Sequence, residues 1–415
     1  MMRASDVVVV GSGMAGLTAA LAAAARGRSV TLAARGAGAL AIGGGCVDLL
    51  GYVNGRIVRG NPLDSIGLLP EGHPYRIIGA QAVRDALDFF EDVCRRHDLP
   101  MSNEGGENVW IPTILGTFRP TWLCLASQDR RLLAQAEKIA AVGVRSLKDC
   151  HAGMVVRMLG RQKNLQGKPI VSLELPSPFG ATHRNITPLD LARFVDTEQG
   201  EEWLRRGLEP HASSGTAFLL PPVLGIVRTR EIWNRLSEGL GCRIMEMAST
   251  PPGVGGLRIR RVLTDALAEA GVVMAENVRA VRARVQGNRC LSIECEAPDR
   301  MRELRGESFI IATGGFFGGG LLAEPGRARE ALFGLELDAP DLVEDWSTPN
   351  VFDAQPYACL GVRVNPRLNP VDAAGAVLWE NVFFAGRSLA GYDFVAEKSG
   401  NGVALASGYH AAQQC

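Results

Sequence analysis

Two short apolar runs flank an alanine-rich stretch near the start of the chain. Val7–Val10 is a run of β-branched residues, as expected for a strand that is buried on both faces of a parallel sheet. Ala15–Ala25 favours a helix because alanine has the best helix propensity, and Gly27 ends that helix. Ser29–Ala33 then resumes as a strand. The pattern predicts one complete βαβ unit.

The same alternation of helix and strand returns in the last third of the chain. The predicted elements are a helix over Leu257–Ala270, a strand over Val272–Ala275, a hairpin over Val278–Val285 and Leu291–Glu296, and buried strands over Phe309–Ala312 and Asn381–Ala385. Glycine follows closely after both of the last two strands. Together with the first βαβ unit, these elements predict a parallel nucleotide-binding sheet that is built from both ends of the chain.

The middle of the chain has a different character. Between residues 96 and 250 proline and glycine are frequent, and helix-like pieces such as Leu189–Val195 alternate with strand-like pieces such as Val171–Leu175. We therefore expect an inserted mixed α+β cap or substrate domain over residues 96–250. Residues 1–95 and 251–415 then form one discontinuous α/β domain.

Composition and charge narrow the range of partners. The 415 residues are 47% hydrophobic, enough for a large core, and 44 Lys and Arg balance 44 Asp and Glu. This balance lacks both the basic footprint of a nucleic-acid-binding protein and a polybasic membrane patch. The longest apolar stretch, Leu17–Ala25, is shorter than the ~20 residues of a membrane span, and no secretory signal is recognisable. We expect a cytoplasmic protein whose partner is a small molecule or another protein.

The cysteines give no sign of a metal site. Nine cysteines are scattered along the chain, and no two have the C-x-x-C spacing that metal sites and iron–sulfur clusters favour. We therefore expect no metal in this chain, and mostly buried, reduced thiols. Any iron–sulfur cluster that takes part in the chemistry then has to be carried by a partner.

A glycine pattern lies between the first predicted strand and helix. In Gly11-x-Gly13-x-x-Gly16 the first glycine permits a tight turn, the second lets a phosphate approach the backbone, and the third allows helix and strand to pack closely. The helix start adds free N–H groups and a partial positive charge. This context predicts a nucleotide cradle rather than a turn without a ligand. Ala34, however, stands where such cradles usually have an acidic residue that binds the adenosine ribose.

Two later segments resemble flavoproteins of the glutathione-reductase or fumarate-reductase type. Ile310–Gly315 is similar to the strand and turn after their second αβ unit, and Asn381–Gly386 is similar to their C-terminal flavin strand. Gly400 and Gly402 open a final apolar helix, whose N-terminus would face the flavin ring and stabilise a reduced, anionic flavin by roughly 0.3–1 kcal/mol. The resemblance implies an α/β, Rossmann-like FAD/NAD(P)-binding flavoprotein fold.

A narrower resemblance runs from end to end of the chain. It rests on the segments Gly43–Leu50, His73–Tyr75, Leu115–Trp122, Leu191–Asp196, Pro251–Pro252, Gly314–Leu321 and His410–Gln414. These segments resemble the B subunit of anaerobic glycerol-3-phosphate dehydrogenase. That family implies flavin-dependent, quinone-linked oxidation of glycerol 3-phosphate to dihydroxyacetone phosphate, in a complex with a catalytic A subunit and a membrane-associated iron–sulfur C subunit. The chain would then lie at the inner face of the cell membrane through a partner subunit.

The resemblance also bears on the residue at position 34. The flavin assigned to this subunit family is FMN, which has no adenosine ribose, so an acid in place of Ala34 would have no use. We therefore expect FMN. The alternative is FAD held without that contact, at a loss of about 1–3 kcal/mol of charge-assisted hydrogen bonding. The glycine pattern itself is of the kind normally used for a pyrophosphate.

The residues expected to contact the flavin lie in the glycine turns and beside them: Gly11, Gly13, Gly16, Arg35, Gly45, Cys46, Thr313, Gly314, Gly386, Gly400 and Gly402. Arg119 is a candidate bidentate donor to the substrate phosphate, with a structural or surface arginine as the alternative. His183 is a candidate for proton transfer, with a structural histidine in a cap loop as the alternative. For Cys46 a packed thiol is the alternative to a flavin contact.

Two questions stay open at the level of sequence. Arg258, Arg260 and Arg261 follow a glycine-rich loop at a helix start, where they either serve a phosphate or form a solvated basic helix face.

The leading hypothesis for function is glycerol 3-phosphate oxidation within the complex. The alternatives are a non-catalytic, flavin-carrying electron-relay or assembly subunit, and an independent fumarate-reductase-like oxidoreductase with a soluble acceptor.

Overall fold

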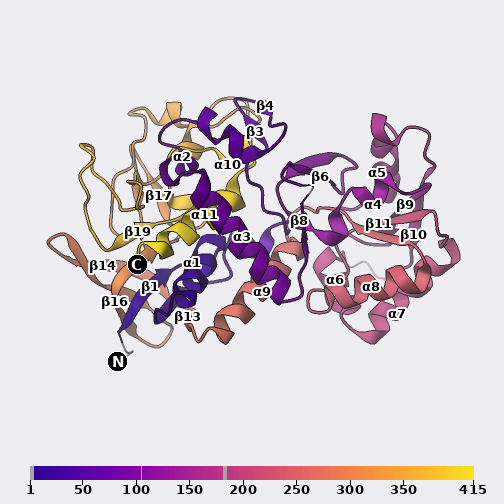
Figure 1. The fold of residues 1–415 in the computed structure, drawn as a ribbon, viewed down its shortest axis with the longest axis horizontal. Coiled ribbons are helices and arrows are strands. Elements are labelled where there is room, and N and C mark those ends of the chain that lie inside the picture. Colours follow the sequence, from indigo (N-terminus) through magenta and orange to yellow (C-terminus); the bar gives the residue numbers. More distant parts are fainter. Residues whose placement is uncertain (1–3, 104, 181–184) are drawn as a thin grey trace. The chain divides into compact units, whose positions relative to one another are not determined.

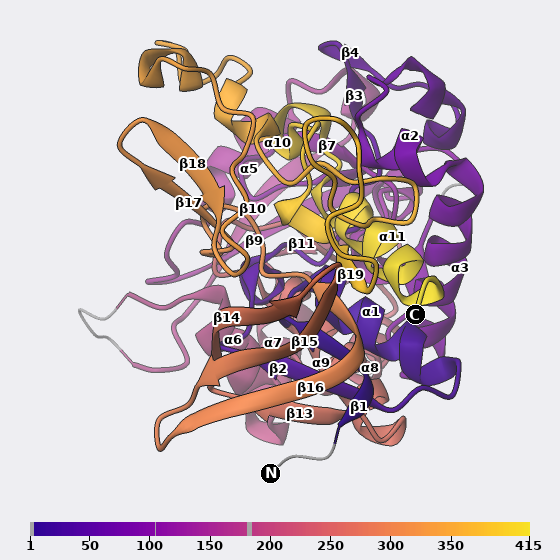
Figure 2. The same cartoon turned by 90° about the vertical axis from the view of Figure 1, so that its left-hand side faces the viewer.

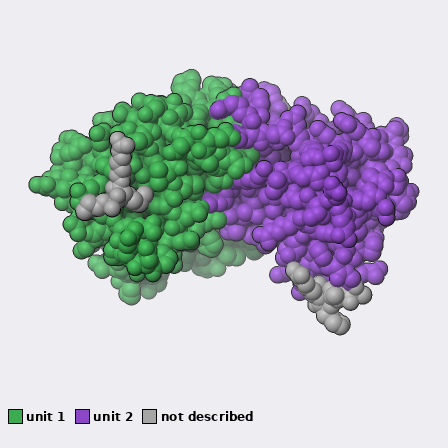
Figure 3. All heavy atoms as spheres, turned by 90° about the horizontal axis from the view of Figure 1, so that it is seen from below, with its two compact units in different colours: residues 1–39, 47–93, 262–415 green, residues 40–46, 94–261 purple. Residues whose placement is uncertain are grey.

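The computed structural model describes residues 4–103, 105–180 and 185–415, and the chain divides into two compact units (Figure 3). The first unit consists of residues 1–39, 47–93 and 262–415, and the second unit of residues 40–46 and 94–261. Besides the insertion expected at 96–250, the second unit thus takes in residues 40–46, 94–95 and 251–261.

A seven-stranded sheet forms the centre of the first unit (Figure 2). Its strands are β1 (Ser5–Val10), β2 (Val30–Ala34), β13 (Val273–Glu276), β14 (Arg279–Gln286), β15 (Arg289–Glu296), β16 (Met301–Ile311) and β19 (Val382–Phe384). They lie in the order β13-β2-β1-β16-β15-β14, and β19 also pairs with β16. The pairs among β13, β2, β1, β16 and β19 are parallel, whereas β14 and β15 form an antiparallel hairpin beside β16. The predicted α/β fold with a parallel sheet is confirmed.

Strand β16 is longer than the hydrophobic pattern predicts. Its last residues, Phe309–Ile311, are fully buried and pair with β1 and β19, as the apolar run indicates. Its first half is polar and continues the strand because it pairs with β15, where Arg302 lies opposite Cys295 and Arg305 opposite Ser292. Cross-strand pairing therefore extends the strand through a stretch that carries no apolar run.

Helices from both ends of the chain pack together in the first unit (Figure 1). A Cβ atom added at Gly408 would lie 2.3 Å from the Ala15 carbonyl oxygen, so the glycine permits the close approach of α11 to α1. The helices of this unit are α1 (Met14–Ala25), α2 (Pro74–Ile78), α3 (Ala80–Arg96), α10 (Phe394–Glu397) and α11 (Gly400–Gln413), and its small hairpins are β3 (Tyr52–Val53) with β4 (Arg56–Ile57) and β17 (Leu321–Glu324) with β18 (Arg327–Glu330).

The second unit has a four-stranded sheet of its own, in the order β10-β9-β11-β12. Every pair in this sheet is parallel, since a helical crossover separates each strand from the next. Its strands are β9 (Lys138–Val144), β10 (Ile170–Leu175), β11 (Thr216–Leu220) and β12 (Arg243–Glu246), and its helices are α4 (Arg131–Ala134), α5 (Ala152–Leu159), α6 (Pro188–Val195), α7 (Glu198–Leu208) and α8 (Thr229–Leu240). Two antiparallel pairs complete it, β5 (Met101–Ser102) with β8 (Cys124–Leu125) and β6 (Val109–Pro112) with β7 (Phe118–Thr121). Helix α9 (Val254–Glu269) begins in this unit and ends in the first.

A buried ion pair holds the start of α9 in the second unit. The guanidinium of Arg258 donates from Nη1 to Glu246 Oε2 at 2.6 Å and from Nη2 to Glu246 Oε1 at 2.9 Å, and both residues are buried. Arg258 Nε donates to the Gly225 carbonyl oxygen, and the carboxylate also accepts from Leu224 N–H and the Ser127 hydroxyl. The expectation that Arg258 serves a phosphate or lies on a solvated helix face is therefore wrong, because all three of its nitrogens are used inside the unit.

Replacing Arg258 with methionine should lower the free energy of unfolding by about 3–5 kcal/mol, because Glu246 is then left buried and uncompensated. The matched control is Arg206→Met, which breaks an exposed pair with Glu202 one helical turn away. That control should cost less than about 1 kcal/mol, since exposed ion pairs contribute little.

Urea unfolding of the full chain, followed by tryptophan fluorescence, measures both variants. Trp110, Trp122, Trp203 and Trp233 all lie in the second unit, so the signal reports chiefly on that unit. An Arg258→Met variant that unfolds like the Arg206→Met control would contradict a structural role for the buried pair.

Candidate functional site

Three glycine turns come together at one edge of the sheet of the first unit. They follow β1, β16 and β19, which are adjacent parallel strands and therefore end at the same edge. A Cβ atom added at Gly11 would lie 2.2 Å from the carbonyl oxygen of Ala312, directly before the turn at Thr313. A Cβ atom at Gly386 would lie 2.8 Å from Cβ of Ala15, at the start of α1. The turn at Gly11 thus contacts the turn at Thr313, and a Cβ atom at Gly315 would lie 3.3 Å from the Arg387 carbonyl oxygen, so the turns after β16 and β19 also lie against each other.

The three glycines of the first turn have different surroundings. Gly11 has a φ of +113°, a conformation that side chains rarely adopt, and a Cβ atom at Gly16 would lie 1.8 Å from the Gly11 carbonyl oxygen. At Gly13, by contrast, an added Cβ atom would meet no protein atom within 4 Å. Gly11 and Gly16 are therefore required by packing, whereas Gly13 leaves space that a phosphate group can use. This arrangement fits the nucleotide cradle expected from the sequence.

The start of α1 suits an anion. Gly13 is the N-cap residue and has no side chain to cap the helix, and the first turn, Met14–Leu17, carries no acidic residue. The first N–H groups of a helix have no acceptor within the helix, and the helix dipole places partial positive charge there. These donors are supplied by the backbone alone, so the helix start is suited to an anion without a charged side chain in its first turn.

Strand β2 ends at Ala34, where related cradles usually have an acidic residue that binds the adenosine ribose. Ala34 is buried, its carbonyl oxygen accepts from Val278 N–H at 3.1 Å, and its register partner on β13 is Glu276. The next residue, Arg35, is exposed. A Cβ atom at Gly38 would lie 2.9 Å from Gly13 Cα, so the loop after β2 lies against the cradle. Arg35 is thus part of a loop that neighbours the expected phosphate position.

The turn after β16 offers a side-chain donor. Within the described part of the chain, the buried hydroxyl oxygen of Thr313 has no hydrogen-bond partner. Gly314 has a φ of +86°, which lets the chain turn directly after Thr313. A buried polar group without a partner is costly in a folded protein, and a ligand at this edge of the sheet would supply a partner for this hydroxyl. Thr313 and Gly314 therefore stay candidates for contact with the flavin.

The glycines at the start of α11 have to be interpreted differently from the sequence prediction. Gly402 N–H donates to the Asp48 carbonyl oxygen at 3.0 Å, and a Cβ atom at Gly402 would lie 2.3 Å from the hydroxyl oxygen of Tyr75. Its only donor and its open side are both taken by the protein, so we assign Gly402 to packing rather than to cofactor binding. A Cβ atom at Gly400 would contact the ring of Phe394 at 3.3 Å, which leaves little room beside it.

His73 links helices α2 and α10, which lie next to α11 in the sequence or in contact with it. From the sequence, this residue was marked only as part of a family segment. His73 is fully buried, and its Nδ1 accepts from Tyr75 N–H at 3.0 Å. Nε2 therefore carries the proton and donates to Glu397 Oε2 at 3.1 Å. Glu397 also accepts from the Ser399 hydroxyl, directly before α11. His73 caps α2 and holds the end of α10, and neither ring nitrogen is free to act as a base.

Three of the predicted flavin or substrate residues lie in the second unit. Gly45 has a φ of +81°, and a Cβ atom there would lie 2.6 Å from Gly255 Cα, so the glycine-rich loops at 43–45 and 253–256 interlock. Cys46 is buried in a small apolar cluster with Val109, Ile111, Cys124 and Ala248, as expected for a packed thiol. Arg119 is half-buried on β7, opposite Ile111 of β6. His183 lies outside the described residues.

Among the described residues, no group of three or more His, Cys, Asp or Glu side chains is placed to hold a metal ion. Over the same residues, no helix combines the length and apolar character that a bilayer span requires.

Comparison with known proteins gives the family of the chain. Residues 6–403 match the FAD binding domain family. The B subunit of anaerobic glycerol-3-phosphate dehydrogenase of Pectobacterium atrosepticum is 29% identical over 99% of this chain and 98% of its own length. The probable B subunit of the Halobacterium salinarum enzyme is 31% identical over 98% of this chain and 96% of its own. Among solved structures, 3-ketosteroid-Δ4-(5α)-dehydrogenase of Rhodococcus jostii RHA1 is similar with a TM-score of 0.39 and 11% identity, over 100% of this chain and 96% of that one, which is too distant to support an argument.

These comparisons correct one expectation and support the rest of the family assignment. The matching family is described as an FAD binding domain, so FMN as the expected flavin is not supported. The lack of an acid at Ala34 removes a single contact and does not determine which flavin binds. The chain is a member of the FAD binding domain family and of the family formed by the B subunits of anaerobic glycerol-3-phosphate dehydrogenases.

Proposed function

We propose that this chain is the B subunit of an anaerobic glycerol-3-phosphate dehydrogenase complex and that it holds FAD at the glycine turns of its first unit. The observation that carries the proposal is the contact among the turns at Gly11, Thr313 and Gly386, in a chain of this family. In the proposed complex a membrane-associated iron–sulfur partner takes the electrons onward to quinone. The complex then lies at the inner face of the cell membrane through that partner.

The residues at the sheet edge have distinct roles in this proposal. The backbone N–H groups at the start of α1 hold the flavin phosphates beside Gly13, and the Thr313 hydroxyl donates a further hydrogen bond. Oxidation of glycerol 3-phosphate to dihydroxyacetone phosphate removes two electrons and two protons, and a bound flavin supplies the acceptor for the hydride. Arg119 and His183 stay candidates for binding the substrate phosphate and for moving the hydroxyl proton.

A second candidate function is favoured by the histidines of the first unit. Both ring nitrogens of His73 are engaged, and His410 Nε2 donates to the Pro366 carbonyl oxygen at 2.9 Å. His73 therefore has no free ring nitrogen for alcohol oxidation, and the Nε2–H of His410 is held by Pro366. A flavin-carrying relay subunit needs no such base, because the A subunit then performs the substrate step.

The cradle is tested by Gly13→Val. The added side chain meets no protein atom near its Cβ, so the variant should fold normally while filling the space of the phosphate. Flavin binding should weaken roughly 100-fold or more, because two or more charge-assisted hydrogen bonds of about 1.5–3 kcal/mol each are lost. Flavin absorbance per purified chain, together with the thermal unfolding midpoint, measures the effect.

The matched control for this variant is Gly153→Val on helix α5, where an added Cβ atom likewise meets nothing within 4 Å. The control should keep its flavin. If Gly13→Val also keeps a full complement of flavin, the cradle does not bind the phosphate.

The identity of the flavin is tested by Ala34→Glu. If FAD is the cofactor, a carboxylate at the end of β2 should provide the missing ribose contact and tighten FAD binding about five- to thirty-fold, or about 1–2 kcal/mol. FMN affinity should not change, because FMN has no adenosine ribose. Titration of apoprotein with each flavin measures both affinities, with Ala34→Gln as the neutral control. Preferential binding of FMN by the wild-type chain would overturn the FAD proposal.

The relay is tested with the purified chain alone. Loaded with flavin and supplied with glycerol 3-phosphate, the chain should reduce quinone poorly, because its sequence has no cysteine spacing that holds an iron–sulfur cluster. Addition of the A and C subunits should restore quinone reduction. Robust quinone reduction by this chain alone would argue against the proposed division of labour.

A further inference from the structure

Residues 338–359 of the first unit, here called the acidic lobe, expose an unusual set of apolar side chains. Phe352 is 94% exposed, Val351 77% and Leu342 62%, and Val343 and Tyr357 are exposed as well. Figure 2 shows the acidic lobe in light orange beyond β17 and β18. Single exposed apolar residues are common on proteins, whereas several along one short segment mark an interaction surface.

A frame of hydrogen bonds fixes the tip of the acidic lobe. The side-chain amide of Gln355 accepts from Thr348 N–H at 3.0 Å and donates to the Thr348 hydroxyl at 2.6 Å and the Asn350 carbonyl oxygen at 3.0 Å. Asn350 in turn accepts from Phe352 N–H and donates to the carboxylate of Asp353. Val351 and Phe352 are therefore presented by an ordered loop, which lowers the entropy lost when another surface binds them.

The base of the acidic lobe is anchored in the first unit, where Gly391 N–H donates to the Cys359 carbonyl oxygen at 2.9 Å and Arg387 donates to the Ala358 carbonyl oxygen. Trp346 is buried, and its indole Nε1 donates to the Pro340 carbonyl oxygen at 2.9 Å. The 3₁₀ turn Val343–Trp346 also contacts the 3₁₀ turn Pro356–Cys359. The chain thus buries one aromatic residue to hold the segment and leaves Phe352 outside. This pattern is typical of a pre-formed anchor rather than of a loop that failed to pack.

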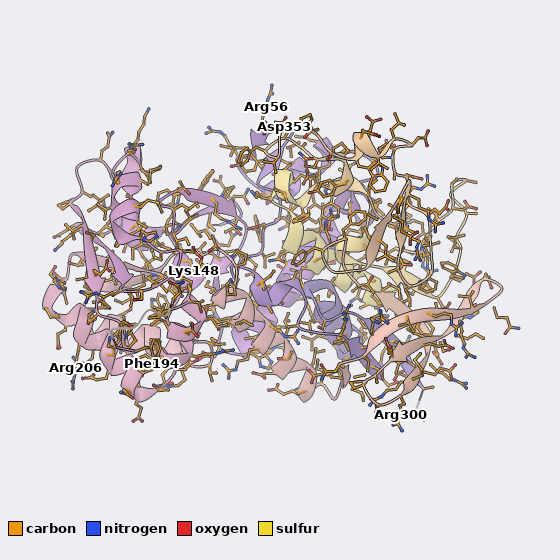
Figure 4. All side chains as sticks on the ribbon, turned by 180° about the vertical axis from the view of Figure 1, so that it is seen from behind. Arg56, Lys148, Phe194, Arg206, Arg300 and Asp353 are labelled. Atoms are coloured by element: carbon orange, nitrogen blue, oxygen red, sulfur yellow. The ribbon has the colours of Figure 1, made fainter. Side chains whose placement is uncertain are left out.

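The charge of the acidic lobe has one sign. It contains the exposed carboxylates Asp338, Asp341, Glu344, Asp345 and Asp353, and no lysine or arginine. Asp338 pairs with Arg363 at 3.0 Å. As far as the described residues extend, Asp341, Glu344 and Asp345 form no ion pair with this chain. Figure 4 labels Asp353, whose side chain lies at the outer surface of the first unit.

We infer that the acidic lobe is a docking surface for another subunit of the enzyme complex, one that presents an apolar pocket rimmed by lysine and arginine. Phe352 and Val351 would fill the pocket, and the carboxylates of Asp341, Glu344 and Asp345 would pair with the rim. A second copy of this chain is a poor occupant, because a symmetric contact places the same carboxylates against each other. An anionic membrane surface repels them likewise.

The inference rests on the proposed membership in a multi-subunit dehydrogenase, and its test uses that complex. The full chain, with its flavin, is mixed with the purified A and C subunits of the enzyme from the same source. The dissociation constant for each is measured by biolayer interferometry at low and at physiological salt. Flavin absorbance and the thermal unfolding midpoint of every variant are recorded alongside.

The double variant Val351→Ala with Phe352→Ala should weaken binding to one of the subunits by tenfold or more, with unchanged flavin content and unfolding midpoint. The matched control is Leu68→Ala, which truncates an apolar residue that is 69% exposed elsewhere on the same unit. The control should bind like the wild type. Equal affinity of the double variant and the control would overturn the inference.

The triple variant Asp341→Asn, Glu344→Gln and Asp345→Asn should weaken binding about five- to tenfold at low salt and reduce its salt dependence. Glu71→Gln, at another exposed acid of the first unit, is the control for charge and should leave binding unchanged. A triple variant with the salt dependence of the wild type would contradict the basic rim.

Three further outcomes would also overturn the inference. One is a wild-type dimer that the double variant converts to a monomer. Another is wild-type binding to vesicles of anionic lipid that the double variant loses. The third is a wild-type chain that binds neither subunit, which would contradict the proposed function as well. Binding that is intact in the wild type and indifferent to the acidic lobe would contradict the docking surface alone.

Discussion

The candidate site depends on contacts of backbone with backbone between β1, α1 and β16. Gly16 lies so close to the Gly11 carbonyl oxygen, and Gly11 so close to that of Ala312, that any side chain at either position would displace its neighbour. This contact brings the start of α1 to the end of β16. Gly13, with open space beside it, is thereby placed where the helix dipole and the free N–H groups act together. Close packing also places the turns at Thr313 and Gly386 beside the start of α1.

Different interactions hold the helices of the two units in place. In the first unit small residues bring helices and turns together, as where Gly408 of α11 meets Ala15 of α1. In the second unit the start of α9 is held by the buried pair of Arg258 and Glu246, whose polar atoms are satisfied by each other and by their neighbours. Close packing of small residues thus joins α11 to α1, whereas an ion pair with its hydrogen bonds holds the start of α9.

Much of the fold was predictable because its causes are local. The βαβ unit near the start of the chain follows from the Val7–Val10 run, the alanine-rich helix and Gly27, and it is present over residues 5–34. What could not be predicted depends on partners that are distant in sequence. His73 meets Glu397 across 324 residues, and the length of β16 depends on its pairing with β15. Arg258 was misjudged because helix position alone does not show that Glu246 is buried beside it.

The candidate site was predictable in outline and less so in its details. The glycine pattern predicts a cradle at the turn after β1, but only the distances show that Gly13 differs from Gly11 and Gly16. Gly402 looked like a cofactor residue because its neighbours form a helix start, whereas its N–H is bonded to Asp48. The expectation of FMN came from the family resemblance, and Ala34 was consistent with it. One missing contact does not distinguish the flavins, since a dinucleotide makes many others.

The central claim is that the glycine turns of the first unit hold a flavin dinucleotide. It is tested most directly by denaturing the purified wild-type chain and determining the mass and amount of the flavin that is released. We predict FAD, at about one molecule per chain, bound at the turn over Gly11–Gly16. Release of FMN, or a chain that carries no flavin and takes up none when FAD is supplied, would contradict the account.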